Sequence, residues 1–208
     1  MNEKTAYLYV NGLGDGSISI KDRMVQWWWQ QANLDLRFAE VDWYKHSFDE
    51  LEKQVITKVE DLFRNFGRVA LIGGSAGGSL ALNAFSQISE RNVVLVLAHA
   101  RLASGDYPAN SRMSLDQRAG IGTEHASVSF VRSVQKAERE VVPNLSEDEK
   151  KKILNLTQLT DMVVDTKLMQ LDGVKTHRSI TFGHSGGYLA HLFADRDLIS
   201  RFVDERIK

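Results

Sequence analysis

The chain has 208 residues, 43% of them hydrophobic and 25% charged, and these proportions fit one globular domain and exclude a disordered or fibrous protein. Its 26 basic and 27 acidic residues give a net charge of -1, which provides no broad positive field, so we expect neither a nucleic acid nor a membrane as a partner. Cysteine is absent, which excludes disulfides, thiol catalysis and cysteine-ligated metals, and no apolar run is long enough for a membrane span or a secretory signal, so we expect a cytoplasmic protein.

In the first half of the chain, short apolar runs rich in β-formers alternate with helical patterns. The predicted strands are Ala6–Val10, Leu36–Tyr44, Val69–Ile72 and Asn92–Ala100. The predicted helices between them are Lys21–Asn33, Phe48–Phe66 and the segment that follows GGSAGG. Ser47 and Glu50 have the spacing of a capping box at the start of the second helix. Strands that alternate with helices predict a parallel sheet covered by helices on both faces.

The alternation breaks after Ala100 and resumes in the last third of the chain. Residues Ser104–Lys152 contain helical segments and no convincing strand, so we expect a helical insertion or cap there. The remaining predicted elements are the strands Ile153–Thr160 and Thr176–Phe182 and a closing helix over Gly187–Ile207. The expected fold is a single three-layer α/β domain spanning residues 1–208, with six mostly parallel strands.

A GxSxG pattern formed by Gly73, Ser75 and Gly77 lies at a predicted strand-to-helix junction. A serine nucleophile on a strained turn needs neighbours without side chains, so that its Oγ is accessible and the next backbone amide can face the substrate. The alternative is a glycine-rich turn that packs a helix closely against a strand, with Ser75 serving only as a helix cap. The local pattern leaves both interpretations open.

The downstream sequence favours the catalytic interpretation. A serine hydroxyl needs an imidazole to take its proton and a carboxylate to orient that imidazole. Asp161 follows the fifth predicted strand and His184 follows the sixth, so both are expected at the carboxyl ends of parallel strands, as Ser75 is.

The succession of strand, GGSAGG elbow, helix, Asp loop and final-strand His resembles the α/β-hydrolase superfamily, in particular its small serine esterases and thioesterases. The order Ser75, Asp161, His184 matches the family's order of nucleophile, acid and histidine. TDMVVD resembles the family's acid loop, with Asp165 in the usual place of a proline, and Asp165 is the alternative acid. ITFGHSGG resembles its last strand. The resemblance implies a minimal fold without the first hairpin, with strand order 2-1-3-4-5-6.

An oxyanion hole requires two aligned donors. Ala76 N–H is the first candidate, and the loop NGLGDG, which resembles the family's His-Gly loop with Asn11 in the histidine place, supplies the second. We expect the Leu13 amide, with Gly12 as the alternative. NGLGDG could instead be a dinucleotide-binding turn with Asp42 as ribose ligand, although it lacks the GxGxxG fingerprint.

Two further groups of residues have no assigned chemistry. Trp27, Trp28 and Trp29 are consecutive, so on a helix they cannot all face the core; we favour packing, and the alternative is a subunit contact or pocket rim. His99 ends the fourth predicted strand and could line the pocket, but we favour a hydrogen-bonded structural histidine. The remaining histidines are expected on the surface or in packing: His46, His125, His177 and His191.

The sequence thus predicts a serine hydrolase that cleaves a small-molecule ester, thioester or related acyl bond through an acyl-enzyme, without a metal or organic cofactor. Substrate access is expected to be set by the insertion. Two alternatives stay open: a non-catalytic binding protein on the same fold, and a nucleotide-binding enzyme that uses the NGLGDG turn. Assembly into a homo-oligomer is also left open.

Overall fold

A computed structural model describes residues 4–104, 123–160, 166–182 and 191–207 of the chain. Its centre is a six-stranded sheet of order β2-β1-β3-β4-β5-β6, in which every neighbouring pair is parallel. The strands are β1 (Thr5–Val10), β2 (Asp35–Phe38), β3 (Arg68–Gly74), β4 (Val93–Ala98), β5 (Ile153–Thr160) and β6 (Lys175–Phe182). The predicted α/β class and strand order are confirmed.

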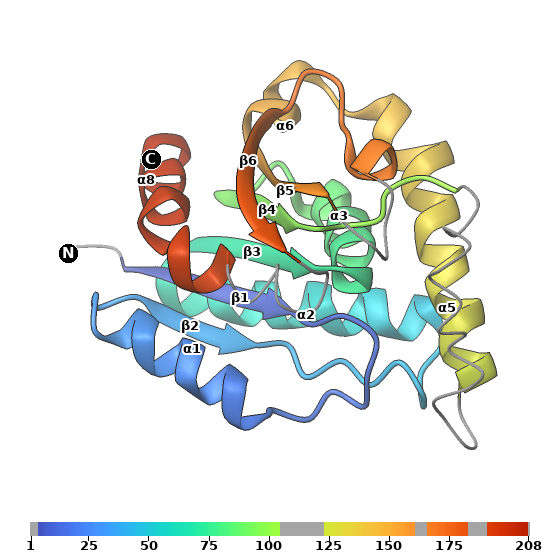
Figure 1. The fold of residues 1–208 in the computed structure, drawn as a ribbon, viewed down its shortest axis with the longest axis horizontal. Helices are drawn as coiled ribbons and strands as arrows, with labels where there is room; N and C mark the ends of the chain where they lie inside the picture. The colour runs from blue at the N-terminus through green and yellow to red at the C-terminus, as the bar shows by residue number, and fades with distance from the viewer. Residues whose placement is uncertain (1–3, 105–122, 161–165, 183–190, 208) are drawn as a thin grey trace.

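Helices cover both faces of this sheet (Figure 1). Helices α1 (Ile20–Gln30) and α8 (Arg196–Arg206) pack on one face. The other face carries α2 (Phe48–Phe66), α3 (Ala76–Ile88) and α5 (Thr123–Lys136). The shorter segments are η2 (Ala137–Val141), η3 (Val142–Asn144), α6 (Glu147–Lys151) and η4 (Thr166–Met169). Helical segments thus fill the described part of the insertion.

Helix α2 shows how local sequence sets an element. The Ser47 N–H donates to the Glu50 carboxylate at 2.8 Å, and the Ser47 side chain accepts from the Glu50 N–H, which forms the predicted capping box. The helix ends at Gly67, whose φ of 72° lies in the left-handed region that glycine adopts without strain. The expected bounds Phe48–Phe66 are confirmed.

Two predicted elements differ from the expectation. The second strand was predicted to reach Tyr44, but β2 ends at Phe38. The chain then turns, because Glu40 has a φ of 53° and the Asp42 carboxylate accepts a hydrogen bond from Tyr44 N–H at 3.0 Å. The closing helix, predicted over Gly187–Ile207, is interrupted: residues 191–194 are helical, Asp195 is not, and α8 begins at Arg196. Residues 187–190 of this prediction lie outside the described residues.

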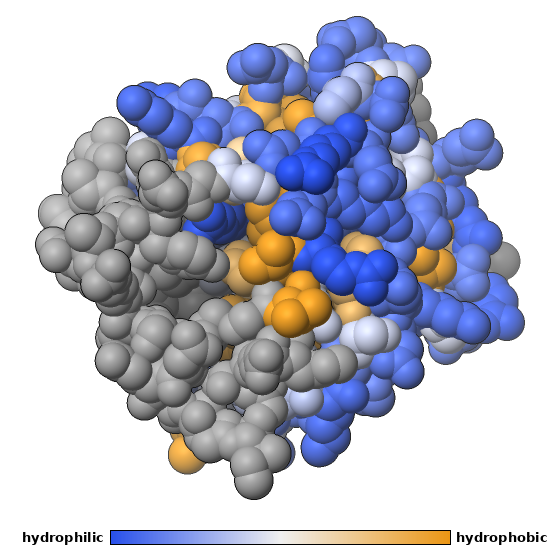
Figure 2. Space-filling model, turned by 90° about the vertical axis from the view of Figure 1, so that its right-hand side faces the viewer, coloured by the Kyte–Doolittle hydropathy of each residue, from blue (hydrophilic) through white to orange (hydrophobic). Residues whose placement is uncertain are grey.

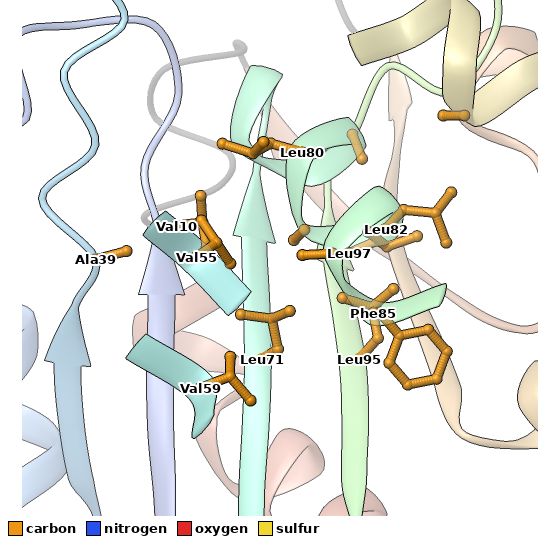
Figure 3. Packing of buried hydrophobic residues seen from close by; sticks show 14 of the residues in the cluster. Val10, Ala39, Val55, Val59, Leu71, Leu80, Leu82, Phe85, Leu95 and Leu97 are labelled. Carbon is orange, nitrogen blue, oxygen red and sulfur yellow. The ribbon is translucent and has the colours of Figure 1, made fainter. Parts of the chain in front are cut away.

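The core lies between the sheet and the helices on each face. On the α2–α3 face, Leu71 and Leu95 of the central strands pack with Val55, Val59 and Phe85 of the helices (Figure 3). All five side chains have no exposed surface. Strands covered on both faces read as continuous apolar runs, as β3 and β4 do.

The outer surface is mainly polar on the side where α5 lies, with hydrophobic side chains in a narrow central band among the described residues (Figure 2). Within the described ranges, no helix is both long and apolar enough to cross a bilayer.

Candidate active site

Ser75 occupies the sharp turn between β3 and α3. Its backbone has φ 53° and ψ -122°, a conformation that costs a non-glycine residue about 1 to 3 kcal/mol. The turn is held from both sides, because Ser75 N–H donates to the Ala98 carbonyl and Gly78 N–H donates to the Ser75 carbonyl, each at 2.9 Å. Ser75 makes no side-chain capping hydrogen bond to α3. The part of the alternative interpretation in which the Ser75 side chain caps α3 is therefore wrong.

The glycines beside Ser75 leave no space for a side chain. A Cβ on Gly77 would lie 2.3 Å from the Val10 carbonyl oxygen and 2.5 Å from that of Asn11. A Cβ on Gly73 would lie 2.6 Å from the Gly78 Cα. These distances are too short for any real contact, so the elbow packs directly against the end of β1 and the start of α3.

The loop after β1 lies over the elbow. A Cβ built on Gly12 would be 3.2 Å from the Ser75 Cβ and 3.6 Å from its Oγ, which places the backbone of this loop beside the candidate nucleophile. Leu13 is half-buried and packs against the core. Trp43 N–H donates to the Gly14 carbonyl at 3.0 Å and ties the loop to the segment after β2.

Asn11 occupies the position that the family resemblance gives to a histidine. Its Oδ1 is buried and has no hydrogen-bond partner in the described part of the chain. The loop is therefore held by backbone packing and by the hydrogen bond to the Gly14 carbonyl. The side-chain oxygen of Asn11 makes no hydrogen bond to the described residues that would hold it.

Asp161, Asp165 and His184 lie outside the described residues. The strands that lead to them end at the same edge of the sheet as β3: Gly74 pairs with Ala98, Ala98 with Leu156, and Thr160 with Phe182. In the sequence, Asp161 directly follows Thr160, and His184 comes two residues after Phe182. The described strands that precede Asp161 and His184 in the sequence thus end at the edge of the sheet where Ser75 lies.

A buried histidine pair lies beside this edge. His99 follows β4 with a φ of 53° and is fully buried, and its ring centroid is 4.7 Å from that of the equally buried His191. His191 Nδ1 hydrogen-bonds to the Asp195 carboxylate, and its Nε2 lies 3.4 Å from Ser179 Oγ. His177 Nε2 is 3.7 Å from the other Asp195 oxygen. The burial of His191 agrees with the expectation that it serves packing, and the burial of His99 agrees with a structural role for that residue.

The sequence analysis did not predict that His99, His191 and Asp195 come together. The signal available was the spacing of His191 and Asp195, four residues apart in a helical pattern, which brings two side chains together. The contacts with His99 and Ser179 arise from different strands, and no local pattern could have shown them.

The acidic residue that the dinucleotide alternative requires has partners within the chain. Asp42, its ribose ligand, forms an ion pair with Lys45 at 3.0 Å and accepts the Tyr44 N–H. Hydrogen bonding to Asp42 and its negative charge raise the pKa of Lys45. Among the residues described, no group of three or more His, Asp or Glu is arranged to hold a metal ion.

Solved structures of α/β hydrolases share this fold. Est1E from Butyrivibrio proteoclasticus superposes with a TM-score of 0.62 at 15% identity, covering 99% of this chain and 89% of its own. Carboxyl esterase 2 from Tuber melanosporum gives 0.64 at 14% identity, over 100% and 79% of the two chains. An alpha/beta hydrolase superfamily protein from Enterococcus faecalis gives 0.55 at 13% identity, over 98% and 92%.

The strand order, the elbow at Ser75 and these likenesses define a protein with the α/β-hydrolase fold, as the motifs predicted. The sequence matches no protein-family model and no curated protein. The likeness therefore lies in the three-dimensional arrangement of the chain.

Proposed function

We propose that this protein is a serine hydrolase that cleaves a carboxylic ester, thioester or related acyl bond. One observation carries the proposal: Ser75 is held at φ 53° and ψ -122° between glycines, beside the loop that follows β1. Backbone strain of this kind persists only where the surrounding structure enforces it, and it clusters at reactive sites. An esterase activity is consistent with the names of the structural neighbours Est1E and carboxyl esterase 2.

In the proposed reaction, Ser75 Oγ attacks the carbonyl carbon while His184 takes the hydroxyl proton and Asp161 orients the imidazole. The amides of Ala76 and Leu13 bind the resulting oxyanion; loss of one such donor slows the reaction by about 10²- to 10³-fold. His184 then protonates the leaving alcohol or thiol as the acyl–oxygen or acyl–sulfur bond breaks. Water, deprotonated by the same histidine, releases the acid and restores Ser75.

The region Ser104–Lys152 is proposed to control which acyl groups reach Ser75. Its described helix α5 is joined to the elbow helix through a buried polar contact. The Asn83 side-chain amide of α3 donates to the Ser133 carbonyl at 2.8 Å, and Ser133 Oγ donates to Ser79 Oγ at 2.9 Å. A displacement of α5 would therefore strain these hydrogen bonds to α3, the helix that begins next to Ser75.

A fluorophosphonate probe tests the nucleophile. The wild-type protein should be labelled and Ser75→Ala should not be, because an activated serine oxygen attacks the probe's phosphorus, forms a phosphonate ester and expels fluoride. Ser86→Ala, which removes a hydroxyl from the same helix α3, is the matched control and should keep the label. An unlabelled wild-type protein with native circular dichroism would refute the hydrolase and favour the binding protein.

Hydrolysis of p-nitrophenyl esters tests the acid. Asp161→Asn should lower kcat by about 10⁴-fold, because the imidazole loses its orienting carboxylate. Asp165→Asn should retain turnover close to that of the wild type. The reverse ranking would move the role to Asp165 and leave the serine mechanism intact.

A further inference from the structure

Helix α1 carries an apolar stripe that faces solvent. Ile20, Met24, Trp27 and Trp28 are spaced at i, i+4, i+7 and i+8, which places them on one side of a helix. Their exposed fractions are 79%, 56%, 59% and 36%. These four residues, here called the α1 stripe, are most of the large hydrophobic side chains that the described part of the chain exposes. Helix α1 forms the lower margin of the molecule in the view of Figure 1.

The opposite side of α1 is fixed in the core, so the α1 stripe cannot turn inward. Val25 and Trp29 are fully buried, and Trp29 Nε1–H donates to the Leu192 carbonyl at 2.7 Å. The Trp28 ring is also held, because its Nε1–H donates to the Phe193 carbonyl at 3.1 Å and the Arg196 guanidinium lies 4.5 Å from its centroid. The tryptophan triplet therefore divides as predicted: one ring packs inside and at least one is exposed.

Cationic side chains flank the α1 stripe. Lys21 and Arg23 are exposed, and at about 100° per residue they lie on opposite sides of the stripe. Neither forms an ion pair with another described residue. The neighbouring carboxylate of Asp22 is bound to the N–H and hydroxyl of Ser19 in the helix cap. Lys21 and Arg23 thus place positive charge on both sides of the stripe, although the whole chain has a net charge of -1. At Trp28, the charge of Arg196 is paired with the exposed Asp197 carboxylate.

We propose that the α1 stripe binds the surface of an anionic lipid bilayer, with α1 lying in the plane of the interface. Interfacial helices combine exposed tryptophan and aliphatic side chains with lysine and arginine that reach the headgroups. The expectation of no membrane partner rested on the net charge, whereas surface attraction depends on cations within a Debye length of the lipid.

A second copy of the chain fits this surface less well. In a two-fold pairing of α1 helices with the axis at Met24, Arg23 would lie beside the axis and approach its own symmetry mate, because only residues next to a two-fold axis meet their counterparts. Two unpaired like charges at the centre of such a contact oppose association.

Co-sedimentation with vesicles tests the proposal on the full chain. The protein should bind vesicles of phosphatidylcholine with about one quarter phosphatidylglycerol, and bind phosphatidylcholine alone weakly. Trp27→Ser should lower the partition coefficient about tenfold. The double variant Lys21→Gln, Arg23→Gln should abolish most of the preference for the anionic vesicles, and added salt should do the same to the wild type.

Helix α5 provides the matched control, because its exposed Val128 and Val131 are hydrophobic but lie outside the α1 stripe. Val128→Ser and Val131→Ser should bind as the wild type does. The proposal is overturned if the folded wild type ignores anionic vesicles, or if the α5 variants lose binding as Trp27→Ser does. A dimer in light scattering that Trp27→Ser dissociates would also overturn it and assign the stripe to self-association.

Discussion

Replacing Ser75 by glycine should stabilise the protein while abolishing its activity. The Ser75 backbone at φ 53° and ψ -122° stores about 1 to 3 kcal/mol, which glycine does not incur. Glycine also raises the entropy of the unfolded chain, at a cost of about 0.5 to 1 kcal/mol relative to alanine. Ser75→Gly should therefore exceed Ser75→Ala in unfolding free energy, by up to about 2.5 kcal/mol.

Urea or thermal unfolding of Ser75→Gly and Ser75→Ala measures this difference. Both variants lack the hydroxyl, so its loss does not contribute to the difference between their unfolding free energies. For a chain of this length, each kcal/mol of added stability raises Tm by about 2 to 4 °C. The control pair is Ser86→Gly and Ser86→Ala in the regular part of α3, where glycine should be the less stable by about 1 kcal/mol. If glycine were also the less stable at position 75, the strain argument would be refuted.

Two other predictions concern stability. Gly78→Ala should destabilise by about 1 to 3 kcal/mol in urea unfolding, since the new Cβ would lie 2.2 Å from the Ala100 Cβ; an unchanged midpoint would contradict this packing. Burial opposes ionisation of Glu149, but hydrogen bonds from Ser89 and Ser146 outweigh it and hold its pKa below the usual 4.5. The carboxylate therefore stabilises the fold above pH 4.5, and this is lost as pH falls through the folded pKa; Glu149→Gln should lose less stability between neutral and acidic pH than the wild type.

The edge of the sheet at which Ser75 lies could be predicted because parallel strands all end on one side. Once the alternation of strands and helices is recognised, sequence order predicts that Ser75, Asp161 and His184 follow three different strands, and for Asp161 and His184 this stays a prediction. The end of β2 could not be foreseen in this way. Apolar residues continue to Trp43, but Glu40 and Asp42 turn the chain out of the sheet, and the residues beyond are buried against helices instead.

The three consecutive tryptophans also show which features the sequence predicts and which depend on tertiary packing. Helical geometry required that they diverge, but only the neighbouring Leu192 and Arg196 decide which ring is enclosed and which is held at the surface. Local sequence determined the elements, their caps and the glycine elbow, because these depend on backbone conformation and contacts a few residues apart. Tertiary structure alone joined His99 to His191 and left one side of α1 uncovered, because both result from packing between segments far apart in the chain.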